Sequence, residues 1–523
     1  MDSRQPVIIG VAQYTNRSRD LDQAREPMEM MEMVARAAAE DAGRPDLLRR
    51  LDSLQVVNIL SWPYADPPGM LAERLGASPS HALYTTVGGD TPLRLLNKTA
   101  ARIHRGESDL ALIVGAEAMH SLMLARRLGV RLPWTERPAR RAEESPAALL
   151  TERTDRAAAS HIQIDGDPRP GYDETEALYG ITLPVRVFPL FENALRAHRG
   201  HGVDEHQRYI ARLSARLSQM VVHNPYAWFP EPRTEEEILS VGPQNRLVCF
   251  PYPKLMNSML EVDQAAAFIV ASAGTARELG VPEERWAYLW SGAYGTDARW
   301  FMREKPCYHR SLIAELTVQR ALALSGLTPD DIDLFDIYSC FPAAVEIGMA
   351  ALGIGLDDPR PLTLTGGLPY AGGPGNNYAS HSLAAAVAWL RRQPEKKALL
   401  TAPGWYFAKH AVAVLSGRPP LRPFRPYDPQ EDWPLLEAQE SPPLLLEADG
   451  PATVETYTVV FDRQGEPAEG IVIGRLDGGQ GPRFLANTPA DRELLSAMCQ
   501  EEFVGKAGRV RYERPQGKNV FIL

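Results

Sequence analysis

Two hydrophobic periods alternate along most of the chain. Short, continuous apolar runs are typical of strands buried on both faces, and they recur at 6–13, 51–60, 84–87 and 110–114. Between them, apolar residues recur every three or four positions, which predicts helices with one buried face at 26–42, 68–76 and 91–105. Strands that alternate with helices predict an α/β fold with a mostly parallel sheet covered by helices.

The stretch from Tyr84 to Ser121 organises this pattern. It reads as a strand, a Gly88-Gly89 turn, a helix that ends at Gly106, and a buried strand. Glycine allows a sharp turn without the steric cost of a Cβ atom. Asp90 or Thr91 is expected to cap the helix, Pro92 suits its first turn, and the inward face is predicted to hold Leu93, Leu96, Ala100 and Ile103. Free backbone N–H groups at such a helix start favour binding or catalysis there.

The same order of elements begins again near residue 244. Apolar runs and helical segments follow one another at 247–254, 264–272, 286–294, 311–325, 332–338, 343–352, 383–390, 397–401 and 410–415. The two halves share no obvious residue identity. The repeated order nevertheless predicts an internally duplicated β/α fold, with an N-terminal half at 1–243 and a C-terminal half at 244–420.

Two regions depart from this texture. Residues 122–239 are rich in Pro, Arg and Glu, and they are interpreted as an excursion that covers one end of the sheet. Residues 421–445 are dense in Pro, Glu and Asp, which is typical of a linker. Beyond them, 446–523 contains four or five alternating strands and one short helix, which predicts a small OB-like β-barrel.

Composition excludes several classes of protein. A net charge of −10 argues against a nucleic-acid-binding body, although a basic cluster at 506–518 leaves binding of single strands by the barrel as a minor alternative. Four scattered cysteines do not form a disulfide framework or a paired metal site, so a reducing cytoplasm and no metal are expected. Neither a signal peptide nor an apolar run long enough to span a membrane is evident.

The motifs GAEAM at 115–119, DQAAA at 263–267 and GGLPYAGGPG at 366–375, together with the glycine turn and its helix, resemble the thiolase superfamily. The resemblance covers roughly 6–420 and is nearest to the sterol-carrier-protein-thiolase-like proteins, including the type 1 class with an appended C-terminal domain. It implies a duplicated five-layer α-β-α-β-α fold, a loop domain at about 122–239, coenzyme A or acyl-CoA as ligand, and an acyltransferase of the acetyl-CoA acetyltransferase kind. Relatives that pair through a sheet edge leave monomer and homodimer both open.

The catalytic positions of that family are altered here. Gly89 stands where the resemblance places the nucleophilic cysteine, although the amides of Gly89 and Asp90 remain able to bind an oxyanion. Tyr338 occupies the place of a histidine in the YSCFP segment, as a general acid or as a packed core tyrosine. Cys340 is a nucleophile only if a neighbour lowers its pKa, and is otherwise a small buried side chain.

The glycine-rich loop departs in the same way. Gly373 replaces a histidine, and His381 is the one imidazole nearby in sequence, as a catalytic or a structural residue. Asn376 and Asn377 are expected to bind thioester or phosphate oxygens. Near the last motif, Thr401 or Ala402 stands where a cysteine is expected.

For the nucleotide of coenzyme A, three arginines spaced four apart on one helical face are the candidates: Arg208, Arg212 and Arg216. A solvated surface is the alternative. Because three catalytic positions change together, ordinary thiolase turnover is not expected, and the pocket is predicted to serve aldol or retro-Claisen chemistry. The other hypothesis is a non-catalytic acyl-CoA-binding or scaffold protein that recruits a partner through its barrel.

Overall fold

The computed structural model describes residues 2–136 and 162–523, so the part of the predicted excursion at 137–161 lies outside the described residues. Ten strands form one continuous sheet in the order β10-β11-β12-β9-β1-β8-β4-β2-β3-β5. They are β1 (Pro6–Thr15), β2 (Ser53–Val56), β3 (His81–Thr85), β4 (Leu110–Ala118), β5 (Gln163–Asp165), β8 (Asp263–Ser272), β9 (Ala287–Thr296), β10 (Leu334–Asp336), β11 (Lys397–Gly404) and β12 (Lys409–Ser416).

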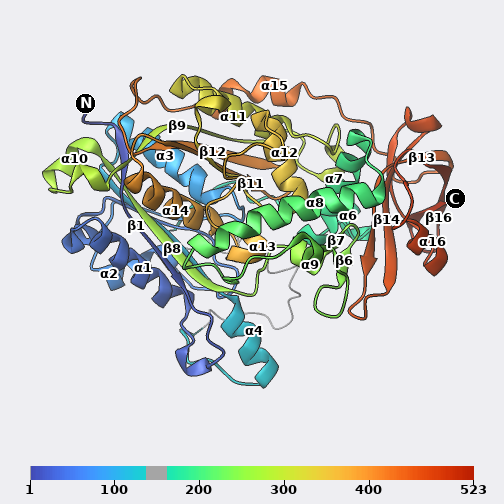
Figure 1. The fold of residues 1–523 in the computed structure, drawn as a ribbon, viewed down its shortest axis with the longest axis horizontal. Helices are drawn as coiled ribbons and strands as arrows, with labels where there is room; N and C mark the ends of the chain where they lie inside the picture. The colour runs from blue at the N-terminus through green and yellow to red at the C-terminus, as the bar shows by residue number, and fades with distance from the viewer. Residues whose placement is uncertain (1, 137–161) are drawn as a thin grey trace.

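The sheet folds into two halves that meet where β1 pairs with β9 over only two residue pairs. Helices α3 (Thr91–Arg105) and α14 (Tyr378–Arg392) contact strands of both halves and each other, so they form a central layer (Figure 1). Helices α1 (Pro27–Asp41) and α2 (Pro67–Leu75) cover the first half, and α11 (Leu312–Ser325) and α12 (Pro342–Leu352) cover the second. The five-layer duplicated fold is confirmed.

The sheet is less parallel than predicted. Parallel pairing is confined to the two outer ends, β2 with β3 and β4, β3 with β5, and β10 with β11. The centre is antiparallel, because β8, β9 and β12 each run against their neighbours. The apolar run assigned to the second half at 264–272 is strand β8, which lies between β1 and β4 of the first half. The predicted boundary between the two halves at 243/244 stays a prediction.

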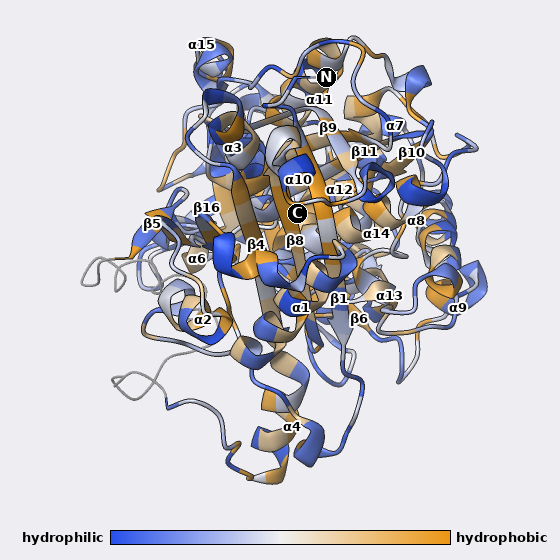
Figure 2. Cartoon of the chain, turned by 90° about the vertical axis from the view of Figure 1, so that its left-hand side faces the viewer, coloured by the Kyte–Doolittle hydropathy of each residue, from blue (hydrophilic) through white to orange (hydrophobic). Residues whose placement is uncertain are grey.

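Hydrophobic strands fill the interior, and polar positions lie outside (Figure 2). All nine residues of β4 are buried, as the continuous apolar run predicts. On α3 the four expected inward residues are fully buried, and Gly106 ends the helix with a φ of 77°. That left-handed conformation is the reason for glycine at this helix end.

The excursion contributes α4 (Met119–Leu128), α6 (Glu174–Leu178), α7 (Pro184–Arg199), α8 (Val203–Ser218) and α9 (Glu235–Leu239). Short helices α10 (Ala273–Glu278), α13 (Leu368–Ala371) and α15 (Trp433–Glu437) lie in connecting segments. Among the described residues, no helix combines the length and apolar character that a membrane crossing requires.

A closed five-stranded barrel ends the chain, which confirms the prediction of a small β-barrel. Its strands are β13 (Gly450–Phe461), β14 (Pro467–Leu476), β15 (Arg483–Asn487), β16 (Ala507–Glu513) and β17 (Lys518–Ile522), with α16 (Arg492–Ala497) between the third and fourth. β13 pairs with both β14 and β16, which closes the barrel. β6 (Leu247–Cys249), which the sequence pattern places in the second half, pairs instead with β13, and β7 (Tyr252–Pro253) pairs with β6.

Candidate active site

The Gly88–Asp90 segment, here called the elbow, joins β3 to the start of α3. Neither glycine has a positive φ, so the backbone conformation alone does not require glycine here. They are needed because other groups approach them closely. A Cβ atom on Gly89 would lie 2.6 Å from the Tyr338 hydroxyl and 2.7 Å from the Pro403 carbonyl oxygen. Real Cβ atoms almost never come that close to other heavy atoms.

The backbone amides of Gly89 and Asp90 have no hydrogen-bond partner within the described part of the chain, whereas the Gly88 N–H donates to Asn376 Oδ1 (2.8 Å). Asp90 does not cap the helix, because its side chain makes no capping bond and instead accepts from Arg94 Nε (3.2 Å). The elbow thus keeps two adjacent free N–H groups beside the Tyr338 hydroxyl. This is the donor arrangement that a carbonyl oxygen requires.

Tyr338 follows β10 and projects from the second half toward the elbow. Its backbone N–H donates to Thr401 Oγ1 (3.3 Å), and its ring packs edge-on against Tyr378. The hydroxyl has no hydrogen-bond partner among the described residues, although the side chain is only 6% exposed. Burial raises the pKa of Tyr338 well above its usual value, so the hydroxyl is protonated at neutral pH. Tyr338 therefore presents an uncommitted O–H donor at the elbow.

Cys340 is not an activated thiol. Burial raises the pKa of Cys340 far above its usual value, and the amides that oppose this shift do not compensate for it. The side chain packs against two apolar clusters. A thiol with a raised pKa carries almost no thiolate at neutral pH, so the interpretation as a packed cysteine fits and the nucleophile does not.

The glycine-rich loop before α14 has its polar groups occupied. The Gly373 N–H donates to the Met259 carbonyl (2.8 Å). The Asn376 amide group donates to Asn58, and the Asn377 amide group donates to the carbonyls of Gly115 (2.7 Å) and Ala266 (3.3 Å). These contacts tie the second half to the first, so these groups reach a ligand only by giving them up.

His381 is buried one turn into α14. Its Nδ1 lies 2.9 Å from Gln13 Oε1, and its Nε2 has no partner among the described residues. Burial lowers the pKa of His381 to about 3. The ring is therefore neutral at physiological pH, and the geometry supports the structural interpretation.

A buried chain of charges leads away from the elbow, and the sequence pattern did not predict it. Arg94 pairs with Asp90 and with Asp165 of β5, and Asp165 also pairs with Lys98. Burial alone would lower the pKa of Arg94, but these carboxylates outweigh it and raise it. Charged residues inside otherwise apolar elements are the sequence signal that could have revealed the chain.

Lys409 is the second missed residue. It begins β12, and its side chain is 2% exposed and donates to the Val87 carbonyl (2.6 Å) just before the elbow. Its ammonium lies 2.9 Å from the position of a Cβ on Gly88, beside an oxygen of Asp90. Burial lowers the pKa of Lys409, and Asp90 opposes that shift.

The fold recurs in a solved structure. A monomeric SCP2-thiolase-like protein type 1 from Mycobacterium smegmatis is 31% identical, matches 100% of this chain and 99% of that one, and has a TM-score of 0.82. The chain belongs to the SCP2-thiolase-like type 1 family. Residues 434–514 also match the model of the thiolase-like protein type 1 additional C-terminal domain.

More distant similarities extend to the wider thiolase fold. An acetyl-CoA acetyltransferase of Methanocaldococcus jannaschii is 25% identical over 180 residues, 34% of this chain, and the match spans only 43% of that protein. The Ltp2-ChsH2(DUF35) aldolase is 17% identical with a TM-score of 0.58, covering 79% of this chain and 97% of that one. Human mitochondrial 3-ketoacyl-CoA thiolase in complex with CoA is 15% identical with a TM-score of 0.55, covering 80% and 100%. The last two show the fold alone.

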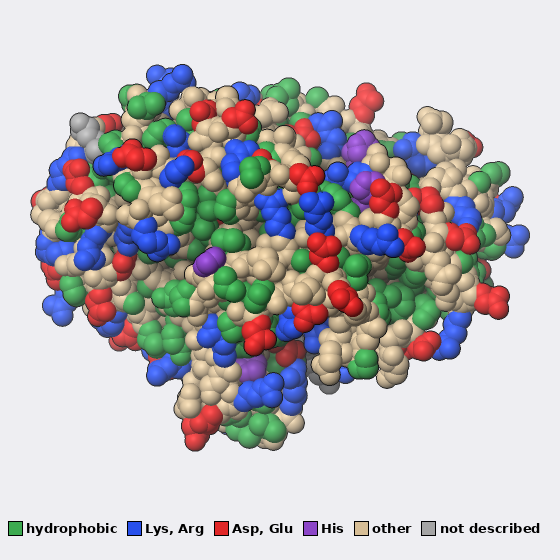
Figure 3. Space-filling model, in the orientation of Figure 1, with side chains coloured by type: hydrophobic (Ala, Val, Ile, Leu, Met, Phe, Trp, Pro, Cys, Tyr) green, Lys and Arg blue, Asp and Glu red, His purple; other side chains and the backbone are tan. Residues whose placement is uncertain are grey.

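In this thiolase-like type 1 chain, the three arginines of α8 share one face but not one role. Arg208 is exposed. Arg212 pairs with Asp357 (2.5 Å), and Arg216 donates to the carbonyls of Leu356, Asp358 and Arg360. Figure 3 shows Lys and Arg intermixed with Asp and Glu over the face that carries α8. Arg216 is therefore largely committed to the 356–360 loop.

One buried cluster has the residue types of a metal site: Glu192, His206 and Glu346. His206 Nε2 lies 2.6 Å from Glu192, the Tyr252 hydroxyl donates to Glu192 (2.5 Å), and Arg199 pairs with Glu346 (2.8 Å). Burial raises the pKa of Glu346 well above its usual value, with a further contribution from Glu192. The three side chains lie within 4.8 Å of one another, and the cluster joins α7 and α8 to α12.

Proposed function

We propose that the chain binds an acyl-CoA thioester at the elbow without forming an acyl-enzyme there. One observation carries this proposal: the Tyr338 hydroxyl and the Pro403 carbonyl fill the space in which a nucleophilic side chain at position 89 would stand. The wider thiolase fold includes a CoA complex and an acetyl-CoA acetyltransferase, which supports the choice of ligand.

The chemistry that these groups favour acts on the thioester carbonyl. The amides of Gly89 and Asp90 would receive the carbonyl oxygen and stabilise the charge that develops on it. Tyr338 would donate its proton as a general acid, because its raised pKa keeps it protonated. Aldol-type cleavage releases a carbonyl compound and the thioester enolate, and retro-Claisen cleavage with water as the acyl acceptor releases a carboxylic acid and the same enolate. Both need this stabilisation of the thioester oxygen, and neither needs an acyl-enzyme. The similarity of fold to an aldolase supports this class.

Thiolysis of acetoacetyl-CoA tests the proposal most directly. Calorimetry is expected to show that the wild type binds acetyl-CoA. The formation of acetyl-CoA from acetoacetyl-CoA is expected not to depend on added CoA. Tyr338→Phe should keep CoA binding and lose any carbon–carbon cleavage that the wild type shows. Efficient thiolysis, or a covalent acyl adduct seen by mass spectrometry, would refute the assignment.

A non-catalytic acyl-CoA-binding or scaffold protein is the second candidate. It is favoured by the lack of an activated base among the groups that the sequence proposed, since His381 is bound to Gln13 and Cys340 has a raised pKa. In that case the C-terminal barrel would recruit a partner. Unchanged CoA binding by Tyr338→Phe, with no product from any thioester by either protein, would favour this candidate.

We place the nucleotide of coenzyme A along α8, with Arg208 as its exposed cation. Arg212 and Arg216 line a surface hollow with the 356–359 loop, but their existing partners compete with phosphate. Arg208→Met should weaken CoA binding more than pantetheine binding. Equal effects on the two ligands would remove α8 from the site.

We further propose that the protein is a cytoplasmic monomer. β5 pairs with β3 at Leu83, Tyr84 and Thr85, so the sheet edge through which thiolases are expected to pair is covered. The similar Mycobacterium smegmatis protein is described as monomeric. Light scattering after gel filtration should give the mass of one chain, and a stable dimer would contradict the proposal.

A further inference from the structure

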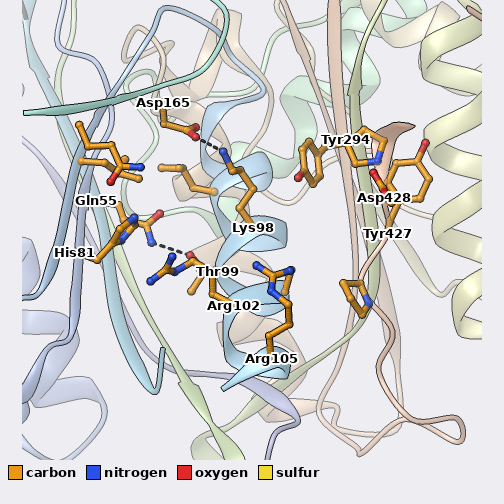
Figure 4. Close-up of a pocket in the computed structure, with 16 residues that line it drawn as sticks. Gln55, His81, Lys98, Thr99, Arg102, Arg105, Asp165, Tyr294, Tyr427 and Asp428 are labelled. Atoms are coloured by element: carbon orange, nitrogen blue, oxygen red, sulfur yellow. Dashed lines mark hydrogen bonds and ion pairs between the residues drawn. The ribbon is translucent and has the colours of Figure 1, made fainter. Parts of the chain in front are cut away.

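A cavity of about 520 Å³ lies beside α3, between β3, β5, β9 and the 426–429 segment (Figure 4). Three cationic side chains of α3 line it at helical spacing: Lys98, Arg102 and Arg105. The elbow is at the N-terminal end of the same helix and does not line this cavity. The cavity is therefore separate from the candidate active site.

Arg102 is the cation whose hydrogen-bonding capacity is least used. Its Nη2 donates to the Glu107 carbonyl (3.2 Å), and its Nη1 lies 3.7 Å from a Glu107 carboxylate oxygen. Its Nε is buried and has no acceptor among the described residues. A buried N–H without an acceptor is costly, which indicates that a ligand oxygen or water occupies this position in solution.

A neutral donor lies opposite. Gln55 Nε2 donates to Ser53 Oγ (3.0 Å), so the Ser53 hydroxyl proton is free to point at His81 Nδ1 (2.8 Å). In the tautomer that accepts this proton, His81 Nε2 carries the ring proton and is a donor. Burial and the nearby positive charge of Arg102 lower the pKa of His81, which keeps the ring neutral.

Acidic groups offset part of the positive charge. Asp165 binds Lys98, Glu107 binds Arg105 and approaches Arg102, and Asp428 lines the cavity. An anion must therefore compete with Asp165 for Lys98 and with Glu107 for Arg105. Arg102 is expected to contribute most to binding, because its Nε is already without a partner.

We propose that this cavity binds the phosphate group of a small molecule. Guanidinium groups recognise phosphate oxygens through paired hydrogen bonds, and the cavity falls within the range of about 300–1,000 Å³ that small-molecule sites occupy. Tyr294 and Tyr427 also line it and provide apolar surface for the rest of the ligand. The proposal is independent of the function assigned to the elbow.

Calorimetric titration of the full chain with ADP tests it. Arg102→Met should weaken ADP binding about tenfold or more, because it removes the least occupied donor. Glu107→Gln should strengthen binding about two- to threefold, because it frees Arg102 and Arg105. Arg102 lies in the last turn of α3 and Glu107 follows the end of that helix, and unchanged thermal unfolding would confirm that the variants fold.

Arg50→Met is the matched control, since it makes the same substitution in an exposed arginine that pairs with Glu278 and lines neither this cavity nor the hollow on α8. The proposal is supported if the control binds ADP as the wild type does and Arg102→Met binds ADP more weakly. It is overturned if ADP does not bind at millimolar concentration, if Arg102→Met binds as the wild type does, or if Arg208→Met is the variant that loses binding. The last result would place the nucleotide on α8.

Discussion

The two central helices begin in loops that look alike in sequence and differ in what their polar groups do. At the start of α3, the amides of Gly89 and Asp90 and the hydroxyl of Tyr338 have no partners among the described residues. At the start of α14, Gly373, Asn376 and Asn377 are all bonded to other parts of the fold. The comparison shows that a glycine-rich loop marks a place where another group lies close to the backbone. The hydrogen bonds of the loop decide whether its polar groups are free for a ligand or already bound to the protein.

The largest loss of stability is expected from a substitution in the glycine-rich loop before α14, whose asparagine side chains are hydrogen-bonded to other parts of the fold. Asn376→Ala removes the acceptor of the Gly88 N–H and the donor to Asn58, and leaves both buried groups unsatisfied. The free energy of unfolding should fall by about 3 kcal/mol or more, measured by urea denaturation. A loss below about 1 kcal/mol would show that the loop relaxes, and the contrast with the elbow would weaken.

A side chain at the elbow should cost less. Gly89→Cys forces a Cβ against the Tyr338 hydroxyl and the Pro403 carbonyl, which should lower the free energy of unfolding by about 1–3 kcal/mol. Gly89→Cys combined with Tyr338→Ala should lose less than the sum of the two single variants, because the two residues compete for one space. Additive losses would contradict this account of the missing nucleophile.

The stability contributed by α14 should also depend on pH, because His381 is buried in that helix. The pKa of His381 is about 3 in the folded protein and about 6.5 in the unfolded chain. Below pH 6.5 the unfolded state takes up a proton that the folded state refuses, so stability is fully present above pH 6.5 and falls with decreasing pH.

Between pH 3 and pH 6.5, His381 contributes about 1.4 kcal/mol per pH unit to the change in unfolding free energy. His381→Gln should reduce the slope of unfolding free energy against pH by that amount, measured by denaturation between pH 4 and 7. His410, whose pKa burial also lowers to about 3, keeps its own share in this variant. An unchanged slope would mean that His381 is protonated in the folded state.

The smallest effect is expected from Tyr338→Phe. Because its hydroxyl has no partner among the described residues, the free energy of unfolding should change by less than about 0.5 kcal/mol. Tyr378→Phe is the matched control, since it loses the hydrogen bond between its hydroxyl and Thr365 Oγ1 (2.5 Å) and should cost about 1 kcal/mol. If Tyr338→Phe proves the more costly of the two, its hydroxyl is structural rather than available to a ligand.

The sequence predicted those features of the candidate site that depend on hydrophobic periodicity and on residues close together in the chain. The strand, turn, helix and strand from Tyr84 onward follow from apolar spacing, Pro92 and Gly106, and the elbow amides follow from the helix start. The wrong expectations concern partners far apart in sequence. Asp90 or Thr91 was expected to cap the helix, but Arg94 takes the Asp90 carboxylate and the Thr91 hydroxyl has no partner among the described residues. Lys409 was missed because nothing local indicates that its ammonium reaches Val87.

The sequence by itself determined the duplicated order of strands and helices, the appended barrel and the loss of a thiol at the elbow, because these depend on residue identity and on periods of two to four residues. Tertiary structure decided the antiparallel centre of the sheet, the joining of β6 to the barrel and the division between free and occupied polar groups. Those features depend on contacts between residues tens to hundreds of positions apart. The hydroxyl of Tyr338 meets Gly89 only when the two halves pack together.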